Sequence, residues 1–409
     1  MNNLNFLVDV LKESPVFKTL EKNVKPGRTV CASGLSTINK SNIIYALCRL
    51  KGVTAFCLAS DEKEAQTLCN DLSCMGLRAY VYPVRDFNFL DFQSRSHEYE
   101  HARLKVLLKL INHECDVAIA CVDAAAQLTV PKNVLEQSVI EFEEGRELSL
   151  EKATKALTLL GYERFDAVEG SGQFSLRGGI LDFFMPSDYP VRCEFWGDEI
   201  TDLSYFDIET QRRFKKADKI TLSPSTEIVI EDRAALADKI EHKAKLLRSK
   251  NRAKAKEKLF SEAELIRSGA MIANADKFIN QIYDKPESLF DYLDRNTLVF
   301  ASEFTAIQER GKSMDFISNE TLMQGFEDGT LCRGFDRFAL TFNECTEFLQ
   351  SHGTIVLENF VHGSMPLKLS EIISFSTKQL SAWGGSYKQL KEDVDGLFTP
   401  ESKGVIFAG

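Results

Sequence analysis

The residues best suited to do chemistry lie in a run with the spacing of a phosphate-binding loop. The run Gly34-Leu-Ser-Thr-Ile-Asn39-Lys40-Ser41 follows the pattern G-x-x-x-x-G-K-[ST], whose backbone N–H groups cradle phosphates. One position departs from this pattern, because Asn39 stands where the second glycine is expected. A glycine there lets the backbone wrap closely around phosphates, so we expect a distorted cradle and an inactive nucleotide site at these residues.

A working ATPase also needs an acidic residue at the end of an apolar strand, where it holds Mg²⁺ and positions water. The best candidate strand, residues 297–300, is followed by Ala301 and Ser302, and Glu303 comes too late in the alternation. The sequence contains no nucleophile elbow, zinc-protease motif or metal-spaced histidine cluster. We therefore expect no catalytic residue, no metal site and no cofactor in this chain, with an ATP-dependent helicase as the alternative.

Length and composition limit the class of protein. A chain of 409 residues holds two to four domains of about 150 residues. Its net charge of −10 argues against a surface that coats nucleic acid. The ten cysteines include no C-x-x-C pair, so we expect buried thiols. Without a secretory signal or an apolar run near about twenty residues, a soluble cytoplasmic protein without a membrane partner is expected.

Two stretches could still contact nucleic acid. Residues 239–258 hold nine Lys or Arg against two Glu on a helical pattern, which indicates a solvated helix face or, alternatively, a DNA-facing one. The polar loop at 82–100 carries Phe87, Phe89 and Phe92, which either pack the loop onto its domain or stack on bases.

The first 125 residues alternate strand and helix signals. Apolar runs near 27–34, 53–60, 78–84 and 115–124 are predicted as buried parallel strands, and helices are predicted near 39–50, 61–75 and 97–111. Repeated βα units of this kind predict a wound α/β domain.

Residues 126–209 change to one helix, at 149–160, followed by strands of alternating apolar and polar residues, which predicts an antiparallel α+β domain. The Gly178-Gly179 pair permits a bulge or sharp bend in the first strand, so a three-strand meander is expected.

Two of these strands separate apolar from charged side chains. One face should carry Phe174, Leu176, Val191, Cys193 and Phe195. Arg177 and Arg192 alternate with these residues, so their guanidinium groups should stand on the exposed side of the sheet. Glu194 is expected to orient Arg192 or to pair across an interface.

The rest of the chain returns to alternating helix and strand signals. Residues 210–362 read as a helix-rich charged stretch followed by strands near 296–304 and up to 360, which completes a split wound domain. Residues 363–409 suggest the start of a third, small α/β unit. Gly409 directly follows an apolar run, so we expect this chain to be part of a longer protein.

Residues 161–213 resemble a segment shared by the nucleotide-excision-repair protein UvrB and the transcription-repair coupling factors. The shared pattern, R-G-x-[IL]-[LI]-D-[IF]-F-P followed by R-x-E-F-F-G-D-E-I, is met at 177–186 and 192–200. The departures are Met185 before the proline and Trp196 in place of a phenylalanine. UvrB has an intact phosphate loop and a long tyrosine-rich hairpin; this chain has neither, so it is more similar to the coupling factors.

The resemblance implies a fold and a function. The fold is a degenerate RecA/UvrB-like wound domain split over 1–125 and 210–362, an inserted UvrA-binding domain at 126–209, and a truncated third domain at 363–409. Coupling factors recognise RNA polymerase stalled at a lesion, displace it with an ATP- and Mg²⁺-dependent translocase on double-stranded DNA, and recruit UvrA. This chain would be the non-catalytic recruitment module.

The resemblance also implies the residues that bind UvrA, namely Arg164, Arg177, Arg192 and Glu194. Ser175 stands where UvrB carries a further arginine. In the whole protein, the UvrA surface is expected to be masked by contact with a C-terminal domain. A UvrB-like damage-verification helicase and a DNA-binding scaffold are the alternatives.

Overall fold

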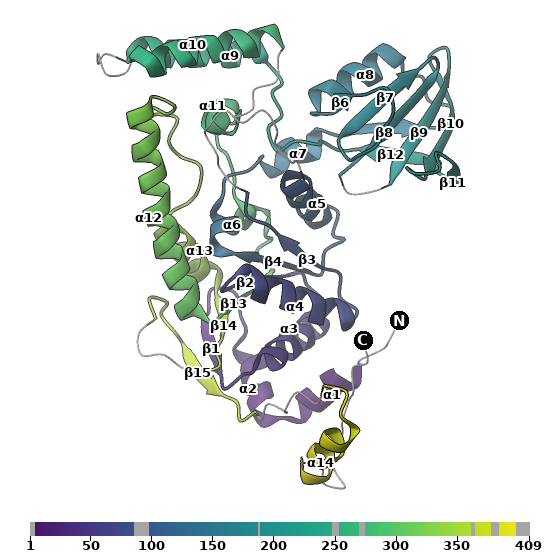
Figure 1. The fold of residues 1–409 in the computed structure, drawn as a ribbon. Helices are drawn as coiled ribbons and strands as arrows, with labels where there is room; N and C mark the ends of the chain where they lie inside the picture. The colour runs from purple at the N-terminus through teal and green to yellow at the C-terminus, as the bar shows by residue number, and fades with distance from the viewer. Residues whose placement is uncertain are drawn as a thin grey trace.

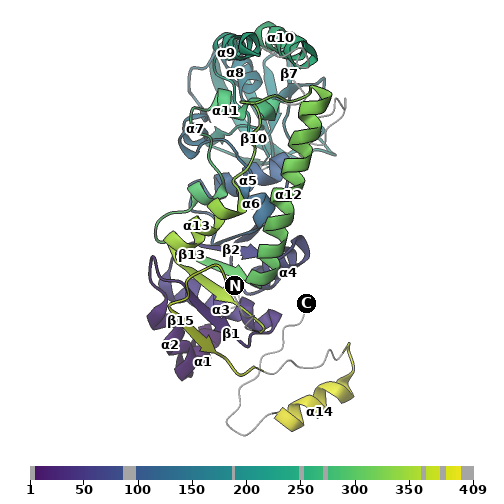
Figure 2. The same ribbon diagram turned by 90° about the vertical axis from the view of Figure 1, so that its left-hand side faces the viewer.

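The structure is a computed structural model of the 409-residue chain and describes residues 5–85, 98–186, 189–247, 253–269, 275–360, 365–377 and 384–397. The aromatic loop at 87–92 and the final apolar run at 404–409 lie outside these residues. Figures 1 and 2 show an elongated molecule, in which a parallel sheet flanked by helices occupies one part and an antiparallel sheet forms a separate body.

The larger body, here called the parallel-sheet domain, is built on seven strands. They are β1 (Val30–Ser33), β2 (Ala55–Ala59), β3 (Ala79–Tyr82), β4 (Val117–Cys121), β13 (Leu298–Ser302), β14 (Thr354–Leu357) and β15 (Glu371–Ser374). Their order is β15-β1-β14-β13-β2-β4-β3, and neighbouring strands pair in parallel. The expected strands of both halves therefore lie in one sheet.

Helices cover both faces of this sheet, which explains its continuous apolar strands. The helices are α1 (Asn5–Glu13), α2 (Pro15–Asn23), α3 (Thr37–Lys51), α4 (Glu62–Cys74), α5 (Glu98–Ile111), α6 (Val122–Ala126), α7 (Lys132–Gln137), α12 (Phe304–Asp328) and α13 (Phe342–His352). Alternate residues of one strand enter different cores: Cys31 packs in the core that contains α5, whereas Val30 and Ala32 pack with α3 and α4.

The second body, here called the antiparallel domain, holds six strands in the order β11-β10-β9-β8-β7-β6. They are β6 (Glu163–Arg164), β7 (Gln173–Arg177), β8 (Ile180–Phe184), β9 (Pro190–Trp196), β10 (Glu199–Phe206) and β11 (Arg213–Lys216). A two-stranded sheet of β5 (Ile140–Glu143) and β12 (Lys219–Leu222), together with α8 (Leu150–Leu159), completes the domain.

The expected three-strand meander is wrong, because the meander has five strands, β7 to β11. Gly178 has a φ of +61°, and Arg177 pairs with Ile180, so Gly178-Gly179 forms the tight turn of a hairpin. Glycine adopts this left-handed conformation without the steric cost that a side chain brings.

Two expected domain boundaries also differ from the structure. The antiparallel domain runs from 140 to 222 instead of 126 to 209, because β11 pairs with β10 and β12 pairs with β5. β15 pairs with β1, so this part of the expected third domain belongs to the parallel sheet. Backbone pairing between distant segments sets both boundaries.

The expected single basic helix at 239–258 is also wrong, because two helices occupy this part of the chain. They are α9 (Arg233–Leu246) and α10 (Ala253–Ser268), which pack against each other and lie side by side in Figure 2. Arg267, near the end of α10, pairs with Asp238 near the start of α9, so the two helices run antiparallel. The remaining short elements are η2 (Ala275–Phe278), α11 (Ile279–Ile282), η3 (Leu289–Tyr292) and α14 (Tyr387–Leu397).

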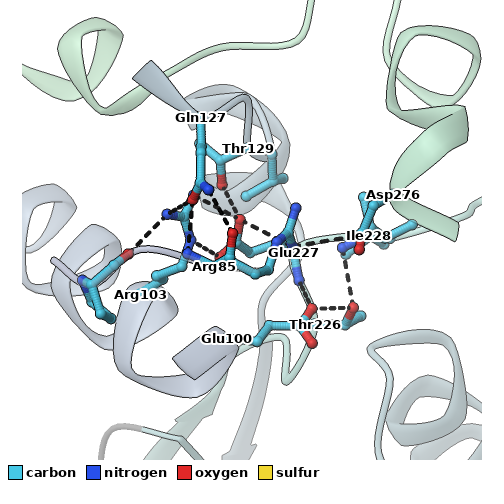
Figure 3. A network of polar contacts seen from close by, with 12 residues as sticks. Arg85, Glu100, Arg103, Gln127, Thr129, Thr226, Glu227, Ile228 and Asp276 are labelled. Carbon is cyan, nitrogen blue, oxygen red and sulfur yellow. Dashed lines mark hydrogen bonds and ion pairs between the residues drawn. The ribbon is translucent and has the colours of Figure 1, made fainter. Parts of the chain in front are cut away.

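A buried polar network fixes the place where the chain returns from the antiparallel domain (Figure 3). Glu227 is fully buried and accepts hydrogen bonds from Arg103 Nε at 2.6 Å and Thr129 Oγ1 at 2.8 Å. Its backbone N–H donates to Glu100 Oε1 at 2.7 Å, and Arg85 Nη1 lies 3.5 Å from its carboxylate. Buried charges need such partners, so the network holds residue 227 against α5 and against the segments that follow β3 and α6.

Candidate protein-interaction site

The phosphate-loop sequence does lie between a strand and a helix, β1 and α3, but its backbone donors are already used. The N–H groups of Gly34 and Leu35 donate to the carbonyl oxygens of Asn359 and Glu358 at 3.1 and 3.0 Å. Gly34 has a φ of +79°, and a Cβ there would lie 2.1 Å from the carbonyl oxygen of Phe375. The chain itself therefore fills the space beside this loop.

Lys40 is also held by protein groups. Its side chain is 3% exposed, and Nζ lies 2.6 Å from Glu303 Oε1, 2.9 Å from Ser302 Oγ and 3.3 Å from Glu64 Oε1. Ser41, which would hold Mg²⁺ in a working loop, is buried and donates to Asp71 Oδ2 at 2.9 Å. The lysine thus acts as an ionic link between α3, α4 and the end of β13.

Asn39 was expected to intrude on the phosphate cradle. Its side chain instead donates to Ser36 Oγ at 2.8 Å, in the first turn of α3. The backbone of residues 358 and 359 occupies the donors that a phosphate would need.

The residues at the end of β13 also differ from expectation. Ala301 points into an apolar core, so it is not the position that faces Lys40. Glu303 adopts a left-handed conformation with a φ of +55°, which turns its carboxylate back to Lys40. The expectation that Glu303 comes too late to reach this site is therefore wrong, since strand alternation does not continue through the turn.

A second carboxylate lies next to this link. Glu358 is fully buried, and its Oε1 accepts the backbone N–H of Phe304 at 2.8 Å. Burial and the neighbouring Glu303 carboxylate raise the pKa of Glu358 to about 7. The phosphate-loop sequence at 34–41 therefore borders a compact set of acidic side chains that surrounds Lys40.

The expected separation of faces in the antiparallel domain is present. Val191, Cys193 and Phe195 are buried and pack in one core with residues of α8. Arg177 and Arg192 lie on the other face, here called the outer face. The two differ in exposure: the side chain of Arg177 is 52% exposed and that of Arg192 only 14%. The expectation of an exposed guanidinium group is thus correct for Arg177 and wrong for Arg192.

Both arginines converge on one buried carboxylate, Asp182, which is 1% exposed. Arg192 donates from Nε to Oδ1 and from Nη2 to Oδ2, each at 2.8 Å, and Arg177 Nη2 donates to Oδ2 at 2.8 Å. The hydrogen bonds to Asp182 raise the pKa of Arg192 above its ordinary value. Asp182 lies opposite Ser175 and Arg192 in the strand register, which places it at the centre of this face.

Glu194 does not take the role expected for it beside Arg192. It forms an ion pair with Arg213, which also lies 3.1 Å from Asp202. Asp182, and not Glu194, therefore orients Arg192.

The remaining positions differ in exposure and in the face on which they lie. Arg164 is exposed on the edge strand β6 and makes no ion pair among the residues that the structure describes. It pairs in register with Phe174 of β7, so its side chain leaves the sheet on the side of the apolar core and not on the outer face. Ser175 is buried. Trp196 is 82% exposed and follows Arg192 and Glu194 at the same alternation. Trp196, which departs from the shared sequence pattern, is thus an exposed aromatic side chain on this face.

Over the described ranges, no group of three or more His, Cys, Asp or Glu residues is placed to hold a metal ion. Among the same residues, no helix combines the length and the apolar character needed to cross a membrane.

Comparison with known proteins adds the family context. Residues 140–228 match the UvrB interaction domain family. The chain is 26% identical over 98% of its length to a transcription-repair-coupling factor of Bacillus subtilis, and 22% identical over 95% of its length to that of Staphylococcus aureus strain MRSA252. These alignments cover 35% and 34% of the relatives, so the chain spans about a third of their length. Residues 140–228 therefore resemble a UvrB interaction domain, in a chain similar over most of its length to the transcription-repair-coupling factors.

Proposed function

We propose that this chain is a non-catalytic module of a transcription-repair coupling factor, which recruits UvrA in nucleotide excision repair. One observation carries the proposal: inside the UvrB interaction domain, the outer face presents the half-exposed Arg177 and the exposed Trp196, and Arg164 is exposed on the edge strand β6. Arginine and tryptophan are the residue types that most often dominate binding energy at protein interfaces.

The phosphate-loop sequence at 34–41 supports a non-catalytic role. The N–H groups of Gly34 and Leu35 bind backbone carbonyls, and Lys40 is paired with carboxylates. A phosphate would have to displace all of these contacts. We propose that ATP and Mg²⁺ act only in translocase domains of the whole protein, together with its RNA polymerase and double-stranded DNA partners.

Titration with purified UvrA tests the recruitment role. A central interface arginine is worth about 2 kcal/mol or more, which corresponds to roughly thirtyfold in affinity. We expect Arg177→Ala and Arg164→Ala to weaken UvrA binding on this scale with little change in melting temperature. Arg146→Ala is the matched control, because Arg146 has 46% side-chain exposure and lies in the same domain, in the segment after β5.

Two outcomes count against this surface. If Arg164→Ala, Arg177→Ala and Arg192→Ala all bind UvrA like the parent, UvrA docks elsewhere. If lost binding accompanies a large fall in melting temperature, these arginines are structural.

The ATP-dependent alternative is tested by calorimetry with Mg²⁺-ATP. We expect no useful binding of ATP or ADP. Sub-millimolar, Mg²⁺-dependent binding that Lys40→Ala abolishes would support a UvrB-like helicase instead.

Masking of the UvrA site in the whole protein is tested by comparing affinities. If a C-terminal domain covers this surface at rest, this chain should bind UvrA more tightly than the intact factor does, by the free energy of opening the masked state. Equal affinities would contradict masking.

A further inference from the structure

We infer that Asp182 is a positioning residue for UvrA binding: its buried carboxylate holds Arg177 and Arg192 in the one geometry that presents a net positive charge to an acidic group of the partner. This inference rests on the proposed function, since it concerns the same outer face. It goes further by naming the residue that builds the site and the chemistry that the site recognises.

The strand register brings these groups together. Asp182 on β8 lies opposite Ser175 on β7 and opposite Arg192 on β9. Ser175 is small and buried, so the space beside it is open to the Arg177 side chain from the next outward position on β7. Two guanidinium groups from different strands therefore reach a single carboxylate at 2.8 Å.

The charges on this cluster do not cancel. Two arginines and one aspartate leave a net charge of +1, and Asp182 is 1% exposed, so solvent and partner meet mainly arginine. Arginine binds carboxylates through paired N–H donors, which makes an aspartate or glutamate of UvrA the matching group for the half-exposed Arg177.

Arg192 is held from a second side. Gln211, in the turn between β10 and β11, accepts from Arg192 through its backbone oxygen and its Oε1, each at 3.1 Å. The Arg192 guanidinium carbon also lies 4.6 Å from the centre of the Phe206 ring. Gln211 has a φ of +59°, a conformation that side chains rarely adopt and that surrounding contacts must hold. This turn and Asp182 together fix Arg192.

Preordered side chains bind more tightly because their rotamer freedom is already lost before the partner arrives. Each immobilised long side chain is worth roughly a factor of two to ten in affinity. Asp182→Asn keeps the size of the side chain and removes the charge that holds both arginines. We therefore expect Asp182→Asn to weaken UvrA binding by about tenfold or more.

A double-mutant cycle separates positioning from a general structural role. UvrA affinity is measured for the parent, Asp182→Asn, the double variant Arg177→Ala/Arg192→Ala, and the triple variant. If Asp182 acts through the arginines, Asp182→Asn should weaken UvrA binding when both arginines are present. When both arginines are absent, the same substitution should change UvrA affinity by less than about twofold. Asp218→Asn, an exposed acid between β11 and β12, is the matched control.

The outcomes are distinct. Parent-like binding by Asp182→Asn, or an equal loss with and without the arginines, overturns the inference while leaving the proposed function in place. Parent-like binding by the double arginine variant overturns this inference and the choice of surface, because UvrA then docks elsewhere. If the parent itself does not bind UvrA, the proposed function is overturned.

If Asp182→Asn does not fold, Gln211→Gly provides the test. Glycine tolerates the left-handed backbone, so the change removes only side-chain contacts, namely Oε1 to Arg192 and Nε2 to the backbone oxygen of Ile208. We expect about threefold weaker UvrA binding with an unchanged melting temperature, and unchanged affinity would overturn the inference.

Discussion

Replacing Lys40 by Met separates the two roles that this lysine could have. Methionine keeps a flexible apolar stem of similar length but removes the ammonium group. In a nucleotide site, the change would abolish ATP binding and leave stability nearly unchanged. In the arrangement seen here, it leaves Glu303 and Glu64 without the cation that both contact. We therefore expect the opposite result, a loss of stability without any nucleotide effect.

The magnitude follows from the burial of the three groups. Removing one partner of a buried ion pair costs about 3 to 5 kcal/mol. Lys40 is 3% exposed, but the side chains of Glu64 and Glu303 are 13% and 27% exposed, so solvent screens part of the remaining charge. We expect Lys40→Met to lower the local stability around β13 by about 2 to 4 kcal/mol.

Hydrogen exchange measures this loss where it occurs, without assuming a single unfolding transition for a chain of several domains. Exchange in β13 and in 354–359 should accelerate by roughly 30-fold to 900-fold, the equivalent of that free energy. Lys51→Met is the control, because Lys51 is an exposed lysine at the end of the same helix. Parent-like exchange in Lys40→Met, together with loss of measurable ATP binding, would refute the structural role.

Three further predictions concern stability. Burial and Glu303 raise the pKa of Glu358 from 4.5 to about 7, so the folded chain holds this proton more tightly than the unfolded chain. The contribution of Glu358 to stability should therefore be greatest below about pH 4.5 and be lost as the pH rises through 7. Glu358→Gln should flatten this dependence in denaturation series between pH 4.5 and 8, and an unchanged slope would contradict it. Gly34→Ala should destabilise β1 and β15 by more than the roughly 1 to 2 kcal/mol expected for the control Gly52→Ala. Both glycines have a positive φ, but only Gly34 faces a backbone oxygen. Equal melting temperatures of the two variants would argue against this packing. Glu227→Gln should lower the free energy of unfolding by about 3 to 5 kcal/mol, because it removes the counter-charge of buried arginines. Calorimetry measures this loss, and a variant as stable as the parent would show that the network in Figure 3 is dispensable.

The local sequence predicted most strands and helices of the parallel-sheet domain. Strands such as β2 and β4 are continuous apolar runs, and buried parallel strands require that composition wherever they lie in the sheet. The alternation in β9 likewise predicted which residues enter the core, because successive side chains of a strand point to opposite faces.

Other features depended on contacts between distant segments. The boundary of the antiparallel domain and the place of β15 follow from strand pairing, which local patterns do not encode. The local sequence could not predict the hairpin at Gly178 for the same reason, since a glycine pair permits either a bend within a strand or a turn between two strands.

The sequence by itself determined that the phosphate-loop motif is degenerate and that arginines alternate with apolar residues in the strands of the antiparallel domain. Only the tertiary structure decided what these residues do. Lys40 meets Glu303 through a left-handed turn, and Asp182 gathers two arginines from neighbouring strands. The physical reason is the same in both cases: a charge becomes buried only when folding brings it a partner, and that partner lies far away in the chain or across a strand pair whose register no single segment specifies.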